Sequence, residues 1–303
     1  MTPTPRILVE PIAYRDPAAA FAPFAHMPFA MLLDGGSQGA QAQFAYIAVE
    51  PFKVITRKPT ETTPDPFAEL RAALNAFHIT PDAGLPAPFI GGAVGFVGYE
   101  VGSALEHLPP RKPPSFPLDL AFGLYDVVVA FDLKNKKAWV MSSGLPERDG
   151  QARTARAKAR AAEITARLGE TLPTAPQTPQ ATWTADFSEP AYKQKIAAII
   201  ELIRAGEIYQ ANMTQRWTAP WPKDLTAFGL YQRLRAISAA PFAAYLSVGD
   251  NLQIISASPE RFLNVDTKGQ VETRPIKGTR PRGKTPEEDR ALAAELRASA
   301  KDR

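Results

Sequence analysis

A lysine set among three arginines is the part of the sequence best suited to chemistry. Residues 274–285 read RPIKGTRPRGKT, which places Lys277 near Arg274, Arg280 and Arg282. Cationic neighbours and partial burial both lower the pKa of a lysine, and the neutral amine is a nucleophile. Arginine binds carboxylates through two parallel hydrogen bonds, so the stretch suits a small anionic substrate. A basic surface hairpin with ordinary ion pairs is the alternative at this point.

Glu260, in the sequence SASPERF, precedes this stretch by one expected hairpin that turns at residues 267–269. The two arms of a hairpin run side by side, so Glu260 is placed to face Lys277. A carboxylate at hydrogen-bond distance from a reacting group can accept and return a proton. We therefore expect Glu260 and Lys277 to act in one site.

The same residues formally match a phosphate-binding loop, because GTRPRGKT from Gly278 fits G-x-x-x-x-G-K-[ST]. Pro281 removes a backbone donor, and Glu287 and Glu288 place negative charge in the first turn of the next helix. The preceding strand belongs to an antiparallel hairpin, whereas a nucleotide loop needs a parallel βαβ unit. We expect no nucleotide site here. In GGAVGFVGYE (91–100), we expect the glycines to allow close packing across a strand.

Composition narrows the class of protein. The 303 residues are 45% hydrophobic and 22% charged, which is typical of a folded chain with one large or two ordinary domains. The net charge is only +4 and the basic residues form no continuous tract, so nucleic acid is not an expected partner. No apolar run approaches the ~18 residues that a membrane span needs, and no secretory signal is visible, so we expect no membrane association and a cytoplasmic protein. Cysteine is absent, and the three histidines are too far apart to suggest a metal site.

The first 170 residues show mainly strand patterns, with apolar and β-branched runs separated by turn residues. One helical pattern, at 149–169, alternates alanine with arginine and lysine, which is typical of a solvated basic face. Strands are expected at 6–9, 28–33, 44–49, 89–97, 120–131 and 137–142, and helices at 66–77 and 149–169.

A linker is expected at 171–182, where TLPTAPQTPQAT is rich in Pro, Thr and Gln. The region 183–303 begins with a helix that Ser188 caps and Gly206 ends, with isoleucines at helical spacing between them. A strand with one polar face is expected over 209–217. Later elements are expected as a helix near 225–238, strands near 242–248 and 251–256, a hairpin turning at 267–269, and a helix from the capping box at 285–288 to about 300.

Five stretches in this order resemble the chorismate-utilising enzymes: GGAVGFVGYE, GEIYQANMTQRW, APFAAYL, SASPERF and ETRPIKGTRPRG. Within that family they are most similar to the aminodeoxychorismate synthase component I branch, which serves para-aminobenzoate and folate biosynthesis. The resemblance runs from about Phe29 to Arg303 and is strongest after Trp183. It implies an α+β fold, with helices around the antiparallel sheets of a β-sandwich that is incomplete here. Residues 1–170 then form an N-terminal region like that of anthranilate synthase component I, and 183–303 form the first part of the chorismate-binding catalytic domain.

The resemblance implies roles for four residues. Lys277, in the sequence PIKGT, matches a lysine that adds to C2 of chorismate as the C4 hydroxyl leaves, after which ammonia attacks C4. Anthranilate synthase relatives have alanine at this position. Glu260 matches a glutamate proposed for proton transfer, and Gly278 and Thr279 match a Gly-Thr pair that contacts chorismate.

A tryptophan pocket is a further implication of the resemblance. Pro241, Phe242 and Ala243 fall where relatives line such a pocket. On its other side, in LLDGGSQ, Gly35 stands where a serine is usual, and this departure argues against tryptophan binding.

The resemblance also implies a Mg²⁺ cofactor whose glutamate ligands lie beyond Arg303, so that no metal ligand is expected in this chain. A chain without cysteine cannot release ammonia from glutamine through a thiolate, so a separate glutamine amidotransferase subunit is expected. We expect the 303 residues to be a truncated part of a longer protein and inactive alone. Two alternatives stay open: an anthranilate- or isochorismate-type sibling, against which Lys277 argues, and a non-catalytic module that binds a partner or tryptophan.

Overall fold

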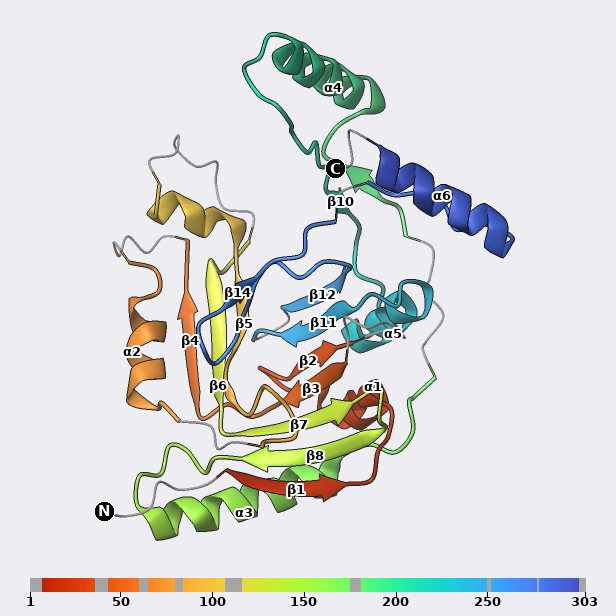
Figure 1. The fold of residues 1–303 in the computed structure, drawn as a ribbon. Coiled ribbons are helices and arrows are strands. Elements are labelled where there is room, and N and C mark those ends of the chain that lie inside the picture. The colour runs from red at the N-terminus through yellow and green to blue at the C-terminus, as the bar shows by residue number, and fades with distance from the viewer. Residues whose placement is uncertain are drawn as a thin grey trace. The chain divides into compact units, whose positions relative to one another are not determined.

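The computed structural model describes residues 7–35, 43–59, 65–79, 84–106, 116–174, 181–249, 252–276 and 278–299. They form antiparallel sheets with flanking helices, which confirms the expected α+β class (Figure 1). The chain divides into two compact units, Met1–Pro173 with Tyr231–Arg303, and Thr174–Leu230. The division into regions 1–170 and 183–303 around a linker at 171–182 stays a prediction, and residues 175–180 of that linker lie outside the described residues.

A seven-stranded antiparallel sheet is the centre of the first unit. Two strands from the second half of the sequence extend it, because Ala243 on β11 pairs with Asp34 on β2. Residues far apart in the chain therefore share one sheet. In spatial order its strands are β1 (Leu8–Ile12), β8 (Lys137–Ser142), β7 (Val127–Asp132), β3 (Phe44–Ala48), β2 (Met31–Asp34), β11 (Phe242–Ser247) and β12 (Gln253–Ser258).

A second sheet of three antiparallel strands packs on the first, in the order β4 (Lys53–Arg57), β6 (Leu120–Tyr125) and β5 (Gly92–Val97). The single strand expected at 120–131 is two strands, because the chain passes from one sheet to the other at the buried Asp126. One hydrophobic cluster contains Val94 and Tyr125 of the small sheet together with Met31 and Leu246 of the large one. The two sheets therefore share a core, as expected of a sandwich.

Gly95 in β5 and Gly98 directly after it confirm the close-packing interpretation. A Cβ on Gly95 would lie 1.9 Å from the carbonyl oxygen of Ala121, and one on Gly98 would lie 2.9 Å from that of Asp119. Gly92 has a different role, because its φ of +118° is a conformation that other residues rarely adopt.

Two short helices pack on the sheets. Ala73 of α2 (Ala68–Ala76) packs with Ile55 and Leu124 of the small sheet. Helix α1 (Pro17–Phe21) continues into the 3₁₀ turn η1 (Ala22–Phe24) and contacts β2 and β3. The remaining helices with residues in this unit are η2 (Tyr99–Ala104), α3 (Gly150–Arg167), α5 (Ala227–Ile237), which continues from the second unit, and α6 (Pro286–Ala298).

The expectation of a solvated basic face on α3 is wrong for three arginines. The helix lies against β8 and β1 (Figure 1). Arg156 Nε is 3.1 Å from Asp126 Oδ2, while Arg160 and Arg167 donate to the two carboxylate oxygens of Glu50 at 2.9 and 2.7 Å. The Asp126 carboxylate is fully buried, so a basic stripe that resembles a solvent face in the sequence instead neutralises acids at the edge of the core.

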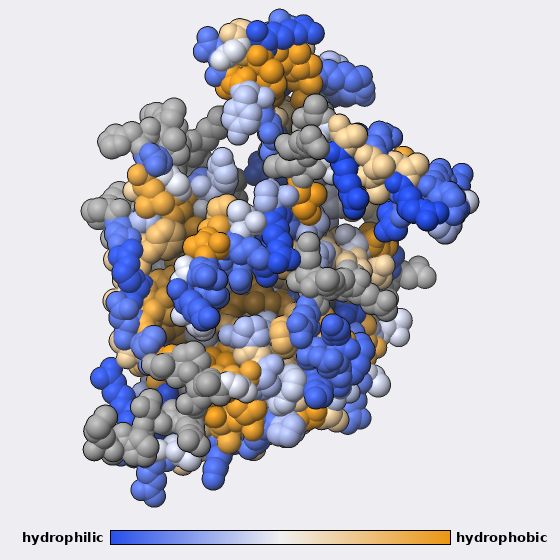
Figure 2. All heavy atoms as spheres, viewed as in Figure 1, coloured by the Kyte–Doolittle hydropathy of each residue, from blue (hydrophilic) through white to orange (hydrophobic). Residues whose placement is uncertain are grey.

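The second unit is built around α4 (Glu189–Arg204) and a two-stranded ribbon of β9 (Thr184–Ala185) and β10 (Trp217–Thr218). Ser188 caps α4 through a 3.4 Å bond to the amide of Ala191, and Gly206 follows the helix with φ +79°, both as expected. The expected strand at 209–217 is wrong, because only its last residue pairs with another strand. No residue of α4 is buried, and apolar side chains are visible on its surface in Figure 2.

Candidate active site

The hairpin that precedes Lys277 has the turn expected from the sequence. Strands β13 (Asn264–Val265) and β14 (Val271–Glu272) pair antiparallel. The Asp266 carboxylate closes the turn by accepting hydrogen bonds from the amides of Lys268 and Gln270 at 2.8 and 2.9 Å. Gly269 has a φ of +78°, which suits glycine at this tight turn.

Lys277 itself lies outside the described residues, and its role as a nucleophile stays a prediction. Gly278 directly after it has a φ of +68°, in the left-handed region that favours glycine. The backbone oxygen of Thr279 accepts a hydrogen bond from Arg280 at 3.1 Å. Gly278 therefore uses the conformational freedom of glycine, while contact of Gly278 and Thr279 with chorismate stays a prediction.

Each of the three arginines near Lys277 in sequence has a carboxylate partner. Arg274 is 2.6 Å from Glu272, Arg280 is 2.8 Å from Glu295, and Arg282 is 2.6 Å from Asp289.

The hydrogen bond from Arg274 lowers the pKa of Glu272, and Arg261 also donates to this carboxylate. The positive charge around position 277 is thus largely balanced by acids. The arginines alone therefore provide less reason for a lowered lysine pKa than their sequence suggests.

Glu260 lies just beyond the end of β12, in a turn in which the Ser258 hydroxyl donates to the Glu260 carbonyl at 3.0 Å. Its side chain is exposed, and within the described ranges no cation lies at salt-bridge distance from its carboxylate. Register places Phe242 opposite Ser258, and the Arg261 guanidinium lies 5.7 Å from the centre of the Phe242 ring. The fold thus brings Phe242 and the segment of Glu260 together, while a joint site of Glu260 and Lys277 stays a prediction.

The formal phosphate loop is occupied by the protein's own acids. The amide of Gly283 donates to Asp289 at 2.8 Å, and the amide of Lys284 donates to Glu288 at 2.7 Å. Thr285 caps α6, as expected, because its hydroxyl accepts a hydrogen bond from the amide of Glu288. The other half of the expected capping box differs, because the Glu288 carboxylate accepts from the amide of Lys284 and not from that of Thr285. Since carboxylates hold the donors that a phosphate would need, these contacts support the exclusion of a nucleotide site.

A buried ionic network that the sequence analysis missed lies beside the expected tryptophan pocket. Asp34, opposite the buried Ala243, accepts hydrogen bonds from the Tyr231 hydroxyl at 2.7 Å and from Arg235 Nε at 2.6 Å. Arg235 also donates to Asp16 at 2.9 Å. Burial, followed by the charge of Asp34, raises the pKa of Tyr231 far above its usual range.

The spacing of Tyr231 and Arg235, one helical turn apart, is the only sequence signal for this pair. Phe242 and Ala243 begin β11, directly after Pro241, next to this network. The structure therefore brings the two sequence stretches of the expected pocket together, while ligand binding there stays a prediction.

The resemblance implied a magnesium cofactor, with its protein ligands expected outside these 303 residues. Among the residues that the structure describes, no three acidic or histidine side chains converge into a metal-binding group. The described residues therefore do not fit a magnesium site, and the chemistry proposed below assigns no step to a metal.

The chain matches the family model described as chorismate binding enzyme over residues 30–303. Aminodeoxychorismate synthase component 1 of Klebsiella aerogenes is 32% identical over 93% of this chain and 62% of its own length. The Escherichia coli protein of the same name is also 32% identical, over 96% of this chain and 64% of its own length. Anthranilate synthase component 1 of Thermus thermophilus is 35% identical over 91% of this chain and 59% of its own length.

Solved structures agree with these matches. Anthranilate synthase component I from Streptococcus pneumoniae superposes with a TM-score of 0.66 at 25% identity, over 88% of this chain and 59% of that one. The menaquinone-specific isochorismate synthase of Escherichia coli shares the fold, with a TM-score of 0.55 at 13% identity over 99% of this chain and 61% of that one. This chain belongs to the family of chorismate binding enzymes.

Proposed function

We propose that the chain is part of an aminodeoxychorismate synthase component I, which converts chorismate and ammonia to 4-amino-4-deoxychorismate. The chain spans 62% and 64% of the length of the two relatives named aminodeoxychorismate synthase component 1 that are described above. Identity alone does not select the reaction, because relatives named anthranilate synthase match at 35% and those named aminodeoxychorismate synthase at 32%. Lys277 in PIKGT carries the proposal, because the anthranilate-type sequence has alanine there.

The proposed reaction uses Lys277 as a nucleophile and leaving group. Its neutral amine forms a bond to C2 of chorismate while the C4–O bond breaks, and the departing hydroxyl takes up a proton to leave as water. Ammonia then forms a bond to C4 while the bond between C2 and the lysine breaks, which releases the enzyme. The temporary bond at C2 directs nitrogen to C4, and the net exchange is ammonia for water.

Glu260 is the proposed proton carrier for both steps. It protonates the departing hydroxyl and later accepts a proton from the nitrogen added at C4. Its exposed side chain, with no cation at salt-bridge distance among the described residues, supports this role because the carboxylate is available to a substrate. The positive φ of Gly278 supports its match to the glycine of the family's Gly-Thr pair, which is proposed to contact chorismate.

Ammonia is proposed to come from a separate glutamine amidotransferase subunit. Relatives carry the name component 1, which implies a second component, and this chain contains no cysteine for glutamine hydrolysis. A cytoplasmic location fits a metabolic enzyme of this kind. No described helix combines the length and apolar character needed to cross a membrane.

Replacement of Lys277 tests the proposal directly. The longest natural form of the protein is assayed with chorismate, ammonia and Mg²⁺, and both the 4-amino and the 2-amino products are measured. In Lys277→Ala we expect kcat for the 4-amino product to fall steeply and residual amination to shift towards C2, since that carbon is no longer protected. Lys268→Ala, in the hairpin turn, is the matched control and should retain the wild-type product.

A covalent adduct provides the second measurement. Wild-type protein incubated with chorismate and no ammonia should carry added mass on the peptide that contains Lys277. Glu260→Gln should lower kcat by about 10²–10⁴-fold, the range typical of a lost general acid or base. Unchanged 4-amino product in Lys277→Ala, together with no adduct in wild type, would remove the basis for this assignment.

A further inference from the structure

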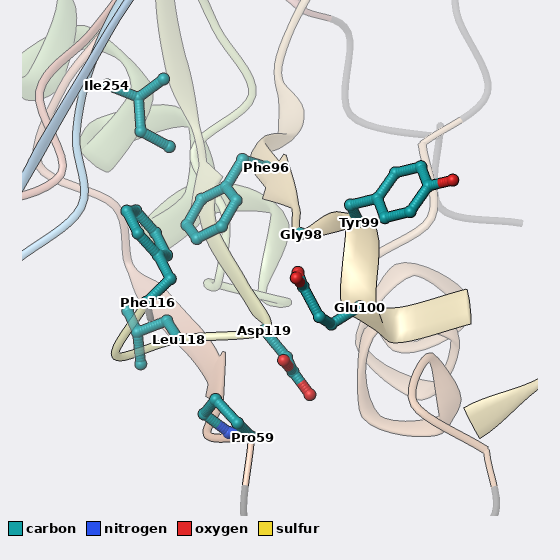
Figure 3. A pocket seen from close by; sticks show the side chains of 9 residues that line it. All are labelled: Pro59, Phe96, Gly98, Tyr99, Glu100, Phe116, Leu118, Asp119 and Ile254. Carbon is teal, nitrogen blue, oxygen red and sulfur yellow. The ribbon is translucent and has the colours of Figure 1, made fainter. Parts of the chain in front are cut away.

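A pocket of about 360 Å³ lies beside the three-stranded sheet, and its described lining shares no residue with the candidate active site (Figure 3). Its lining combines residues near the ends of β4, β5 and β6 with one residue of β12 from the large sheet. Pockets that bind small molecules have volumes of about 300–1,000 Å³, so this one is large enough for a single ring with a short substituent. Among the residues that the structure describes, the lining consists of Pro59, Phe96, Gly98, Tyr99, Glu100, Phe116, Leu118, Asp119 and Ile254.

One end of the pocket is apolar. The rings of Phe96 and Phe116 meet edge to face, with centroids 5.7 Å apart and an interplanar angle of 89°. The side chains of Leu118 and Ile254 complete this wall (Figure 3). A wall of this composition favours an apolar ring, because aromatic edges and aliphatic groups offer contact area and no hydrogen bonds.

The other end of the pocket is acidic. In Figure 3 the carboxylate of Glu100 points into the pocket, whereas the ring of Tyr99 points away from it. Asp119 also lines this end, but it is 2.6 Å from Arg57, and both side chains are buried. Within the described residues Glu100 has no cation at salt-bridge distance, so its charge is available to a ligand.

We propose that this pocket binds a small molecule that joins one apolar ring to a protonated amine, with the ring between Phe96 and Ile254 and the amine at Glu100. The charge of the pocket selects the class of ligand: Glu100 has no cation at salt-bridge distance among the described residues, so its carboxylate attracts a cation and disfavours an anion. The site is independent of the proposed reaction, since none of its residues belongs to the candidate active site. Ile254 lies on β12, which ends two residues before Glu260, so a ligand there would contact the strand leading to the active site.

Binding of 2-phenylethylamine to the whole protein tests the proposal, with 3-phenylpropanoate as a probe of similar shape and opposite charge. Isothermal titration should detect the amine and give at least tenfold weaker binding of the carboxylate. Glu100→Gln should weaken binding of the amine about tenfold, as expected when a charge-assisted hydrogen bond is lost. Glu106→Gln, an exposed carboxylate on the same segment and outside the pocket lining, is the matched control and should bind like wild type.

Phe116→Ala tests the apolar end separately and should also weaken the amine at least fivefold, with its unfolding midpoint confirming that it is folded. The proposal is overturned if wild type does not bind the amine, or if the carboxylate binds equally well. The proposal would also be overturned if Glu100→Gln bound the amine as tightly as wild type does. The same holds if Glu106→Gln lost as much affinity for the amine as Glu100→Gln. If Phe116→Ala does not fold, Leu118→Ala replaces it with the same expected loss, and unchanged binding would again contradict the proposal.

Discussion

Helices α3 and α4 have similar lengths, 18 and 16 residues, and both show apolar side chains at helical spacing, yet only α3 has a buried face. Ala157, Ala161 and Ile164 of α3 are buried, whereas Ile200 and Ile203 of α4 are 42% and 40% exposed. Most helical stability in proteins comes from packing of the apolar face, so the two helices should respond differently to the same substitutions. Periodicity indicates which face is apolar, but not whether another part of the protein covers it.

The ion pairs of the two helices differ in the same way. Arg156 and Arg160 of α3 face Asp126, whose side chain is fully buried. Arg204 and Glu201 of α4 pair with each other, and their side chains are 71% and 68% exposed. Exposed pairs contribute little to stability, whereas removal of one partner from a buried pair leaves an uncompensated charge.

The largest expected contrast is between Ile164→Ala in α3 and Ile203→Ala in α4. Ile164 is 1% exposed, so its truncation leaves a cavity and should lower the free energy of unfolding by about 2–4 kcal/mol. Ile203→Ala should change it by less than about 0.5 kcal/mol, because Ile203 is already 40% exposed and alanine favours the helix. Denaturant unfolding of the three proteins provides the measurement. A comparable loss in Ile203→Ala would show that α4 has a packed face in solution.

Asp126→Asn should produce the next largest effect. The substitution keeps the shape of the side chain but removes the charge that faces Arg156 and Arg160, and we expect a loss of about 1–3 kcal/mol. The loss stays below that of a fully buried pair because Arg156 is 32% exposed and Arg160 keeps Glu50. Glu201→Gln, which breaks the exposed pair of α4, is the control, and it should change the free energy of unfolding by less than about 0.5 kcal/mol. Equal unfolding curves for Asp126→Asn and wild type would mean that the α3 pairs contribute nothing net.

Local signals allowed much of the fold to be predicted from the sequence. Ser188, Gly206 and the turn at 267–269 specify their own backbone geometry through hydrogen bonds to nearby residues or through positive φ, and these predictions are confirmed. The strand expected at 209–217 was wrong because pairing depends on a partner elsewhere in the chain. The break at Asp126 was missed because two strands in different sheets form one continuous apolar run.

The candidate site shows the same limit. Residue identity and motif order placed Lys277, Glu260 and Gly278 in one candidate site, but the acids that balance the neighbouring arginines were not foreseen. Asp289 reaches Arg282 only because α6 folds back on the loop before it, and that geometry is not visible as a spacing pattern. The network of Asp34 and Tyr231 joins residues 197 positions apart, which no local pattern could indicate.

The smallest expected effect concerns the pH dependence of the α3 contacts through Glu50. Burial raises the pKa of Glu50, but hydrogen bonds from Arg167 and Arg160 outweigh it, so the folded-state pKa lies below the usual 4.5. A carboxylate with a lowered folded-state pKa contributes stability above its unfolded pKa and loses that contribution as the pH falls through the folded value. Wild type should therefore exceed Glu50→Gln in free energy of unfolding by about 1 kcal/mol at pH 7, and the difference should shrink below about pH 4.5.

Denaturant unfolding between pH 3 and pH 7 measures this difference. Glu189→Gln in α4 is the control, because Glu189 pairs with Lys193 through side chains that are 78% and 73% exposed. Wild type and Glu189→Gln should therefore have nearly the same free energy of unfolding at every pH. A difference between wild type and Glu50→Gln that grew towards acid pH would reverse the assigned sign. It would mean that the arginines of α3 do not stabilise the Glu50 carboxylate.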